Sequence, residues 1–140
     1  MKPSHIEHIG IAVNDLKTSI SFYEKVLGLK CYNVEDVPEQ KVKTAFFIVG
    51  QTKIELLEST DSEGLIGKFI EKRGEGIHHI AFAVEKIEEQ LIHAEKLGIK
   101  LIDVSPRKGA EGLDIAFLHP KSTNGVLIEL CEDKNNEKNK

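Results

Sequence analysis

The hydrophobic positions of this chain follow an order of strand-like and helical patterns that occurs twice. An apolar run headed by a histidine, residues 8–13, precedes an amphipathic stretch in which apolar positions recur every three or four residues. The same order begins again at residue 79, 71 positions later. The helical positions are Leu16, Ile20, Tyr23 and Leu27 in the first copy and Ile87, Leu91, Ala94 and Leu97 in the second. This spacing predicts two helices that each bury one face.

A glycine follows each predicted helix. Gly28 and Gly98 stand just after the last apolar position of the two stretches. Because glycine adopts the left-handed conformation without steric cost, we expect both to cap their helices. Each glycine leads into an apolar run that is typical of a strand, residues 29–34 and residues 99–104.

Two further strand-like runs complete each copy. Residues 44–49 match residues 115–118 through a shared Ala-Phe pair, and residues 53–58 match residues 127–132 with an offset of 74. The extra residues of the second copy fall in its turn-rich segment before the last strand. Each copy therefore predicts the order strand, helix, strand, strand, strand.

The repeat defines the expected organisation of one α+β domain that spans all 140 residues. The first βαβββ module covers residues 5–58, and the second covers residues 77–132. A linker, residues 59–76, contains apolar residues that predict a short helix: Leu65, Ile66, Phe69 and Ile70. Residues 133–140 form a polar tail that we expect to be frayed.

Composition limits the possible partners. The apolar share is 40%, the charged share is 30% and the net charge is −4, so no basic field would attract nucleic acid. The apolar runs are too short to span a bilayer, and no signal-peptide stretch precedes the first strand. Cys31 and Cys131 do not form a CxxC pair, which favours a reducing compartment. We therefore expect a cytoplasmic protein that binds neither nucleic acid nor membrane.

The repeat places one histidine and one glutamate at equivalent positions in each module. A single glutamate between apolar strand residues faces solvent about as often as it is held by a partner, and a single strand histidine is more often structural than a ligand. The repetition changes this balance. If the modules pack about an approximate two-fold axis, four side chains converge: His8, Glu55, His79 and Glu129. Two imidazoles and two carboxylates suit a divalent ion and leave coordination sites for water or substrate.

Two adjacent histidines compete for the position in the second module. Neighbouring strand residues face opposite ways, so only one of His78 and His79 can point inward. His79 aligns with His8 in the repeat, so we choose His79. The remaining histidines have no counterpart: His93, expected to be exposed; His119, a weaker candidate for lining the cleft; and His5.

Several runs of the chain, in order, are similar to those of one superfamily. They are residues 8–13, 37–40, 72–81, 115–122 and 125–130. With the two-module pattern they resemble the vicinal oxygen chelate (glyoxalase/bleomycin resistance/dioxygenase) superfamily, and within it the methylmalonyl-CoA epimerase family. The resemblance covers about residues 5–132. It implies a glyoxalase-like fold in which the modules form a curved mixed sheet around a metal cleft.

Carried over by position, the resemblance implies the same four metal ligands as the repeat. Some members carry glutamine at the second ligand, where this chain has Glu55. Cobalt, manganese, nickel and zinc all suit these nitrogen and oxygen donors.

The family's reaction inverts the carbon between the thioester and the carboxylate of methylmalonyl-CoA. A divalent ion would stabilise the charge that develops when the proton on that carbon leaves. Our hypothesis is that Glu129 and Glu55, or one of them with a nearby group, remove and return the proton, which leaves the identity of the second base open. Some members carry a further glutamate where this chain has Thr44, which cannot act as a base at neutral pH. Glu39 is the weaker alternative, since a solvated loop charge explains it better.

The resemblance also implies substrate-binding loops in the second module. The glycines Gly109, Gly112 and Gly125 fall in these loops together with Lys121 and Ser122. We assign substrate binding to Lys121, Ser122 and Gly112. Lys121 can meet a carboxylate or a phosphate as a point charge, although an ordinary surface lysine fits the sequence equally well.

Other functions of this superfamily remain open. Lactoylglutathione lyase (glyoxalase I) also moves a proton between adjacent carbons. An extradiol dioxygenase uses two histidines and one carboxylate, and the second glutamate argues against it. An antibiotic-binding protein of the same fold would use an aromatic cleft, which a chain with 6% aromatic residues and no tryptophan does not favour. We also expect a homodimer, since exposed sheet edges are often covered in this way.

Overall fold

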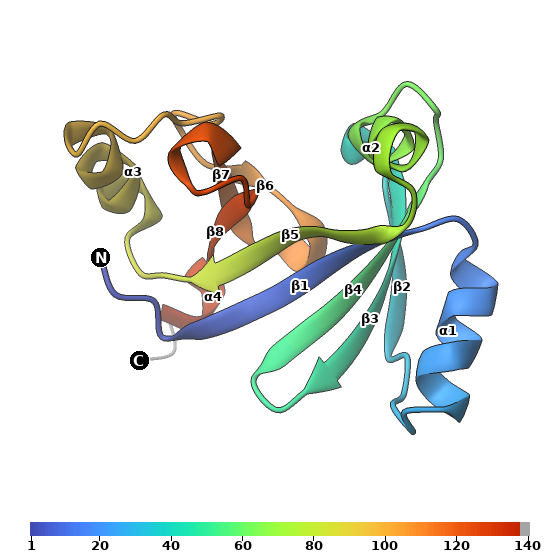
Figure 1. Cartoon of the computed structure of the whole chain (residues 1–140). Helices are drawn as coiled ribbons and strands as arrows, with labels where there is room; N and C mark the ends of the chain where they lie inside the picture. Colours follow the sequence, from blue (N-terminus) through green and yellow to red (C-terminus); the bar gives the residue numbers. More distant parts are fainter. Residues whose placement is uncertain (138–140) are drawn as a thin grey trace. The chain divides into compact units, whose positions relative to one another are not determined.

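The structure is a computed structural model that describes residues 1–137 (Figure 1). The chain divides into two compact units. The first unit is His8–His78, and the second unit combines Met1–Glu7 with the residues from His79 onward. The first strand therefore begins in the second unit and continues into the first.

The first unit contains a mixed sheet with the strand order β2-β3-β4-β1. Strand β1 runs parallel to β4, whereas the β2–β3 and β3–β4 pairs are antiparallel. A 3₁₀ turn, η1, joins β2 to β3, and helix α2 follows β4. The bounds are β1 His5–Val13, α1 Leu16–Lys25, β2 Asn33–Val37, η1 Pro38–Gln40, β3 Val42–Val49, β4 Thr52–Ser59 and α2 Leu65–Arg73.

The second unit repeats this arrangement with the strand order β5-β8-β7-β6. Strand β5 runs parallel to β8, and the β7–β8 and β6–β7 pairs are antiparallel. The bounds are β5 Gly76–Ala83, α3 Ile87–Lys96, β6 Arg107–Lys108, η2 Ala110–Gly112, β7 Asp114–Leu118, η3 Pro120–Ser122, β8 Ile128–Glu132 and α4 Lys134–Glu137. The predicted α+β fold of two βαβββ modules is confirmed.

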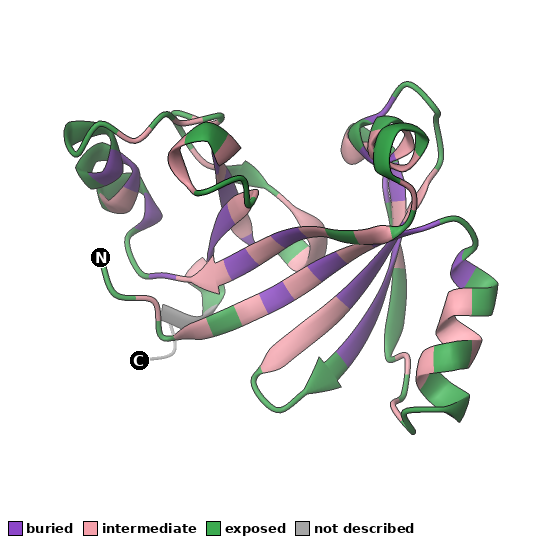
Figure 2. Ribbon diagram, in the orientation of Figure 1, coloured by how far each residue is buried: buried purple, intermediate pink, exposed green. Residues whose placement is uncertain are grey.

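Each sheet buries one face beneath its helix, and the buried residues lie on the strands and on parts of the helices (Figure 2). In the first unit the α1 residue Leu16 packs on Phe47 of β3 and Leu56 of β4. In the second unit the α3 residue Leu91 packs in one cluster with Leu130 of β8. Because strand side chains alternate, the residues between these core positions point to the sheet face away from the helix. That second face carries the histidines and glutamates discussed below.

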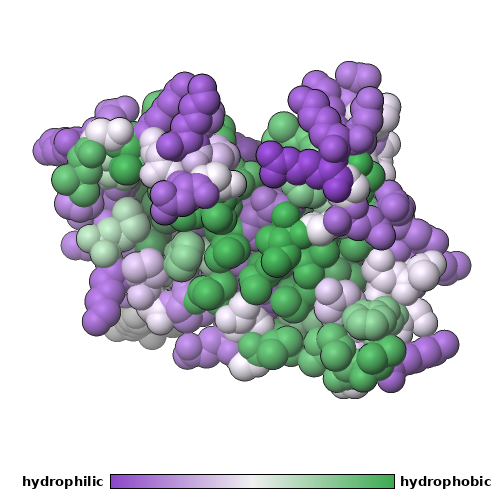
Figure 3. Space-filling view, in the orientation of Figure 1, coloured by the Kyte–Doolittle hydropathy of each residue, from purple (hydrophilic) through white to green (hydrophobic). Residues whose placement is uncertain are grey.

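Both helices end before their last predicted apolar position. Helix α1 ends at Lys25, and helix α3 ends at Lys96. Leu27 is 54% exposed and Leu97 is 69% exposed, so the prediction that they share the buried face is wrong. The helical periodicity directs a side chain only while the backbone is helical, and both leucines lie beyond that point. Exposed apolar residues gather at this end of α1, as Figure 3 shows: Phe22, Val26 and Leu27.

The predicted glycine caps are present. Gly28 and Gly98 have φ angles of 67° and 84°. After α3 the Gly98 amide donates to the Glu95 carbonyl at 3.0 Å, and the Ile99 amide donates to the Ala94 carbonyl at 3.1 Å. This pair of bonds is the Schellman motif, which requires a left-handed residue between them.

The strands expected directly after the caps lie further along the chain. Strand β2 begins at Asn33 rather than at residue 29, and β6 begins at Arg107 rather than at residue 99. In the second unit the Phe117 carbonyl accepts from two successive amides, those of Ile102 and Asp103. The Asp103 carboxylate in turn accepts from the Phe117 amide at 2.9 Å. A side chain thus replaces the carbonyl of a strand partner, so residues 99–104 form no regular ladder.

The predicted linker helix is α2, which belongs to the first unit. The expected frayed tail contains α4 at its start, and Lys134 forms ion pairs with Glu88 and Asp114. Residues 138–140 of that predicted tail lie outside the described residues. Within residues 1–137, no helix combines the length and the apolar character needed to cross a membrane.

Candidate metal centre

In the first unit the two predicted ligands form a buried pair. His8 lies on β1 and Glu55 on β4, and each is 4% exposed. The two strands are parallel with Gly10 opposite Glu55. His8 lies two residues before Gly10, so its side chain points to the same face of the sheet as Glu55. Its Nδ1 atom is 3.2 Å from the Glu55 Oε2 atom.

In the second unit the same register produces the same pair. Ala81 of β5 lies opposite Glu129 of β8, and His79 precedes Ala81 by two residues. The His79 Nε2 atom is 3.4 Å from the Glu129 Oε1 atom, and both side chains are buried. The sequence repeat is thus also a repeat of strand register, which controls which side chains meet.

The sequence left open whether Glu55 faces solvent or a partner, and in the structure it lies beside a partner. The neighbours of Glu55 on β4, Ile54 and Leu56, pack in the core against α1. Glu55 consequently points to the other face, where it is buried against His8 instead of facing water. A carboxylate that is removed from water without a partner costs several kcal/mol, on the order of 3–5, so the imidazole is an energetically necessary neighbour.

The donor atoms of each pair fit a divalent cation. One imidazole nitrogen and one carboxylate oxygen lie close together in each unit, and both types bind cobalt, manganese, nickel or zinc. A buried imidazole–carboxylate pair also suits a structural role, with the glutamate orienting the histidine. Neither pair alone offers enough donors for a complete coordination sphere of these ions.

The pair of the second unit has two neighbours that sequence reasoning did not assign. The Cys131 thiol donates to the Glu129 Oε2 atom at 2.7 Å, from two residues further along β8. The Phe117 ring meets the His79 ring edge-on, with 5.7 Å between the ring centroids. Both neighbours follow from strand alternation, since they lie on the same face as Glu129.

His78 lies on the opposite face of β5 from His79. Its ring meets Phe69 of α2 edge-on at 5.0 Å. Burial lowers the pKa of His78 to about 4, so the ring is neutral at physiological pH. His79 is therefore the histidine that lies beside Glu129.

The other predicted histidines have local roles. His93 is exposed on α3, as predicted. The His5 Nδ1 atom lies 2.8 Å from the Ser4 hydroxyl, and the His119 Nδ1 atom accepts from the Lys121 amide at 3.1 Å.

The residues assigned to substrate binding lie in the two 3₁₀ turns of the second unit. Lys121 is exposed on η3. The Ser122 hydroxyl accepts from the Lys100 amide at 2.9 Å, so it ties the chain after α3 to η3. The Gly112 carbonyl accepts from the Lys108 ammonium at 3.5 Å. These contacts are structural, and substrate binding by the three residues stays a prediction.

Thr44, which replaces the further glutamate of some members, and Glu39, the weaker alternative base, differ sharply in burial. Thr44 is buried on β3 opposite Leu57 of β4, whereas Glu39 is exposed in η1. The exposure of Glu39 agrees with a solvated charge.

A second pair of glutamates was aligned by the repeat but received no role from the sequence. Glu58 follows Glu55 by three residues, and its Oε1 atom accepts from the Leu16 amide at the start of α1 at 2.8 Å. Glu132 follows Glu129 by three residues and accepts from the Lys86 and Ile87 amides at 2.8 and 3.0 Å. A carboxylate at a helix N-terminus satisfies free amides and the helix dipole. These residues attach the last strand of each unit to its helix.

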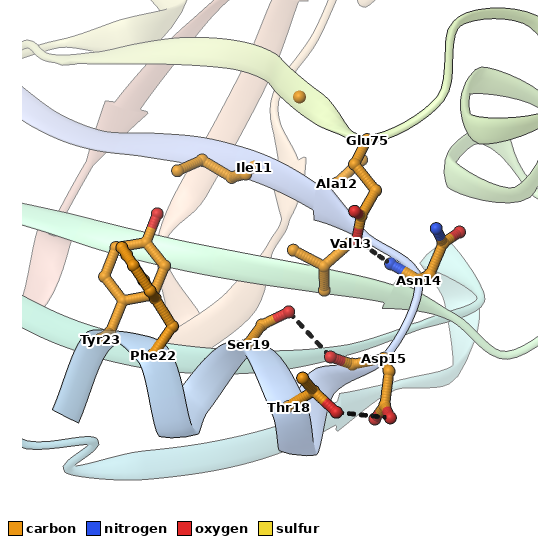
Figure 4. A pocket seen from close by; sticks show the side chains of 11 residues that line it. Ile11, Ala12, Val13, Asn14, Asp15, Thr18, Ser19, Phe22, Tyr23 and Glu75 are labelled. Carbon is orange, nitrogen blue, oxygen red and sulfur yellow. Dashed lines mark hydrogen bonds between the residues drawn. The ribbon is translucent and has the colours of Figure 1, made fainter. Parts of the chain in front are cut away.

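A cavity of about 550 Å³ lies in the first unit between β1, α1 and Glu75 (Figure 4). It is on the helix side of the sheet, lined by Ile11 and Val13, whereas His8 belongs to the other face. The Thr18 hydroxyl donates to the Asp15 carboxylate, and the Asn14 amide donates to Glu75. These polar groups hold the start of α1, and the cavity contains none of the predicted site residues.

Comparison with known proteins identifies the family of this chain. The glyoxalase/bleomycin resistance protein/dioxygenase superfamily model matches residues 7–117. The chain is 48% identical to the uncharacterized protein YqjC of Bacillus subtilis over 136 residues, with 97% of each chain covered. It is 36% identical to mouse mitochondrial methylmalonyl-CoA epimerase over 130 residues, with 92% of this chain and 73% of the mouse protein covered.

A solved structure extends the agreement to three dimensions. Methylmalonyl-CoA epimerase of Streptomyces coelicolor, in complex with 2-nitronate-propionyl-CoA, superposes with a TM-score of 0.91 at 34% identity. The match covers 95% of this chain and 96% of the Streptomyces chain. With its two βαβββ units and their paired histidines and glutamates, the chain belongs to the glyoxalase/bleomycin resistance protein/dioxygenase superfamily.

Proposed function

We propose that this protein is a metal-dependent epimerase that interconverts the two epimers of methylmalonyl-CoA. The observation that carries the proposal is the buried histidine–glutamate pair, repeated at the same strand register in both units. The similarity to methylmalonyl-CoA epimerases over more than nine-tenths of the chain supports the substrate class.

We propose that the two pairs together hold one divalent ion, with His8, Glu55, His79 and Glu129 as its ligands. Each pair supplies two donors, so both are needed to reach four. The ion would be cobalt, manganese, nickel or zinc. Metal analysis of the purified protein tests this proposal, and one ion per chain is the expected content.

The reaction requires the removal of a proton from the carbon between thioester and carboxylate and the return of a proton to its other face. A bound divalent ion would stabilise the negative charge that develops on the substrate oxygens. In the proposed mechanism a carboxylate oxygen of Glu129 takes the α-proton from one face, and the C–H electron pair passes into the thioester. Glu55, which starts this direction of the reaction protonated, then gives its proton to the same carbon from the other face. The electron pair returns from the thioester to form the new C–H bond, Glu55 is left as a carboxylate, and the reverse reaction exchanges the two roles.

Burial supports this assignment of acid and base. Glu55 and Glu129 are 4% and 3% exposed and each lies beside an imidazole, so both carboxylates are held in defined positions away from bulk water. Thr44, the residue at the position of a further glutamate in some relatives, carries a hydroxyl that stays un-ionised at neutral pH and therefore cannot act as a base. Glu55 and Glu129 are the carboxylates of these faces that lie beside an imidazole, and we propose them as the two bases.

The test is deuterium incorporation at the α-carbon of methylmalonyl-CoA in D₂O, with and without a chelator. We expect exchange that stops when the metal is removed and returns when cobalt or manganese is added. Conversion of the hemithioacetal of methylglyoxal and glutathione should be assayed in parallel. Conversion of that substrate without exchange in methylmalonyl-CoA would replace the epimerase with a lactoylglutathione lyase.

Three further expectations accompany the proposal. The protein acts in the cytoplasm as a homodimer, and Lys121, Ser122 and Gly112 contact the acyl-CoA. Analytical ultracentrifugation tests the dimer. The Michaelis constant of a Lys121→Gln variant tests the contact of the loops with the substrate.

A further inference from the structure

Arg107 lies next to the histidine–glutamate pair of the second unit through one aromatic ring. Its guanidinium carbon is 5.5 Å from the centroid of the Phe117 ring, within the range of a cation–π contact. The Phe117 ring in turn meets His79 edge-on, and Phe117 lies opposite Glu129 in the β7–β8 register. The positively charged guanidinium of Arg107 therefore lies over the Phe117 ring, which contacts His79 of the proposed centre.

Asp103 holds this guanidinium in a defined orientation. Its Oδ1 atom accepts from the Arg107 Nε atom at 3.2 Å, and its Oδ2 atom accepts from the Phe117 amide at 2.9 Å. One carboxylate thus fixes both the arginine and the strand beneath it.

The far edge of the guanidinium is available to a ligand. In the part of the chain that the structure describes, residues 1–137, Arg107 makes its side-chain hydrogen bond through Nε, and the side chain is 41% exposed. The terminal nitrogens carry four N–H donors in a planar fork that matches a carboxylate or a phosphate. An arginine that is stacked on a ring and held at Nε loses little rotamer entropy when it binds such a group.

The first unit has no cation at the equivalent place. Arg107 lies opposite Ile115 of β7, and the matching residue of the first unit, Glu35, lies opposite Thr44 of β3. The ring equivalent to Phe117 is Phe46, and Tyr32 packs on it at 5.8 Å between centroids. An anion is therefore favoured beside the second pair and disfavoured beside the first.

We propose that Arg107 binds an oxyanion of the substrate and thereby fixes the direction in which the substrate enters the site. This inference rests on the proposed function, because the substrate class there is an acyl-CoA with a free carboxylate. That carboxylate and the phosphates of CoA share the chemistry that a guanidinium recognises.

The experiment compares Arg107→Gln with Lys108→Gln. Lys108 is the next residue of β6, and its ammonium pairs with Asp114 at 2.6 Å, so its substitution makes the same change of charge at a different place. We expect Arg107→Gln to raise the Kd and the KM for methylmalonyl-CoA about tenfold or more, and Lys108→Gln to change them less than about twofold. Arg107→Lys, which keeps the charge without the fork, should fall between them. Equal losses in both glutamine variants, or no loss in Arg107→Gln, would overturn the proposal.

The source of the oxyanion is found by repeating the measurement with methylmalonyl-pantetheine, which retains the carboxylate and lacks the CoA phosphates. An equal loss with both substrates assigns the carboxylate to Arg107. A loss that appears with the CoA ester alone assigns a phosphate. Either result supports the oxyanion site.

Substrate binding and α-proton exchange are measured separately, so failure of the oxyanion site can be distinguished from failure of the proposed function. Calorimetric binding of methylmalonyl-CoA needs no turnover. If the wild-type protein binds the ester through Arg107 but exchanges no α-proton, the epimerase proposal fails and the oxyanion site stands. If the wild-type protein exchanges the proton and Arg107→Gln binds as tightly, the oxyanion site fails and the epimerase proposal stands.

Discussion

The two units repeat one chemical arrangement and differ in what surrounds it. In each, a histidine of the first strand meets a glutamate of the last, and a phenylalanine lies opposite that glutamate. Tyr32 packs on the phenylalanine of the first unit, and Arg107 packs on that of the second. The repeated residues lie on paired strands, and the differing residues lie near the sheet edges. Strand register therefore keeps the histidine, glutamate and phenylalanine in the same positions in both units. The residues near the sheet edges differ between the units.

A second difference lies beside the glutamates themselves. Cys131 donates to Glu129 in the second unit, and the repeat places Leu57 at the corresponding position of the first. Glu129 thus has a polar neighbour on its own strand where Glu55 has an apolar one. The two carboxylates are thus equivalent in position and unequal in surroundings.

The largest expected effect comes from replacing each carboxylate in turn. Glu129→Gln and Glu55→Gln should each lower the epimerisation rate by about 100-fold or more, because each removes one of the two proton-transfer groups. Exchange of the substrate α-proton with D₂O should distinguish the two variants. Each variant should still exchange the α-proton of one epimer in D₂O, and the two variants should retain opposite epimers. Retention of the same epimer by both variants would contradict the two-base assignment.

The next effect concerns the metal. His8→Ala and His79→Ala should each weaken binding of cobalt or manganese by more than about 100-fold, because loss of a ligand exceeds the 10- to 100-fold effect of losing an outer neighbour. Titration calorimetry of the apo protein measures this affinity. His93→Ala is the matched control, since His93 is exposed on α3. An ion that binds normally to either ligand variant would show that one unit holds it alone.

A smaller effect is expected from the glutamates that anchor the helices. The Glu132 carboxylate accepts hydrogen bonds from two backbone amides, and the Glu58 carboxylate accepts one. A glutamine retains one acceptor oxygen, so Glu132→Gln should lower the free energy of unfolding by about 1–2 kcal/mol and Glu58→Gln by about 0.5 kcal/mol or less. Urea denaturation midpoints provide the comparison. Similar losses in both variants would mean that the number of accepted amides does not set the difference.

The smallest expected effect is a pH dependence of the free energy of unfolding that comes from His78. This residue belongs to the first unit, where its ring contacts Phe69 of α2. Burial lowers the pKa of His78 to about 4, below the 6.5 of an exposed histidine. Between these values the unfolded chain binds more protons, so the free energy of unfolding falls as pH falls from 6.5 toward 4. At pH 5.5 the wild-type protein should have lost about 1 kcal/mol more than a His78→Gln variant, relative to pH 7.5. Equal pH profiles in chemical denaturation would exclude this contribution.

The fold was predictable to a large extent because its signals are local and repeated. Helical spacing, terminal glycines and apolar runs identified α1, α3 and the closing strands of each unit. The predictions for Leu27 and Leu97 failed because both helices end before these residues, and the strand expected at residues 99–104 failed because a side chain accepts a backbone hydrogen bond there. Asp103 accepts the Phe117 amide, so the strand expected at residues 99–104 is displaced, and no spacing rule contains that information.

The residue types of the candidate site could be read from the repeat, whereas the contact of each histidine with the glutamate of its own unit came from the structure. The sequence by itself determined that His8 and Glu55, and again His79 and Glu129, occupy matching positions in two modules. Only the tertiary structure decided that both glutamates are buried against an imidazole, that Glu58 and Glu132 tie the last strands to the helices, and that Arg107 stands on Phe117. The physical reason is that alternation along a strand is a local property, whereas the partner across the sheet depends on register and on edge contacts between residues far apart in the chain.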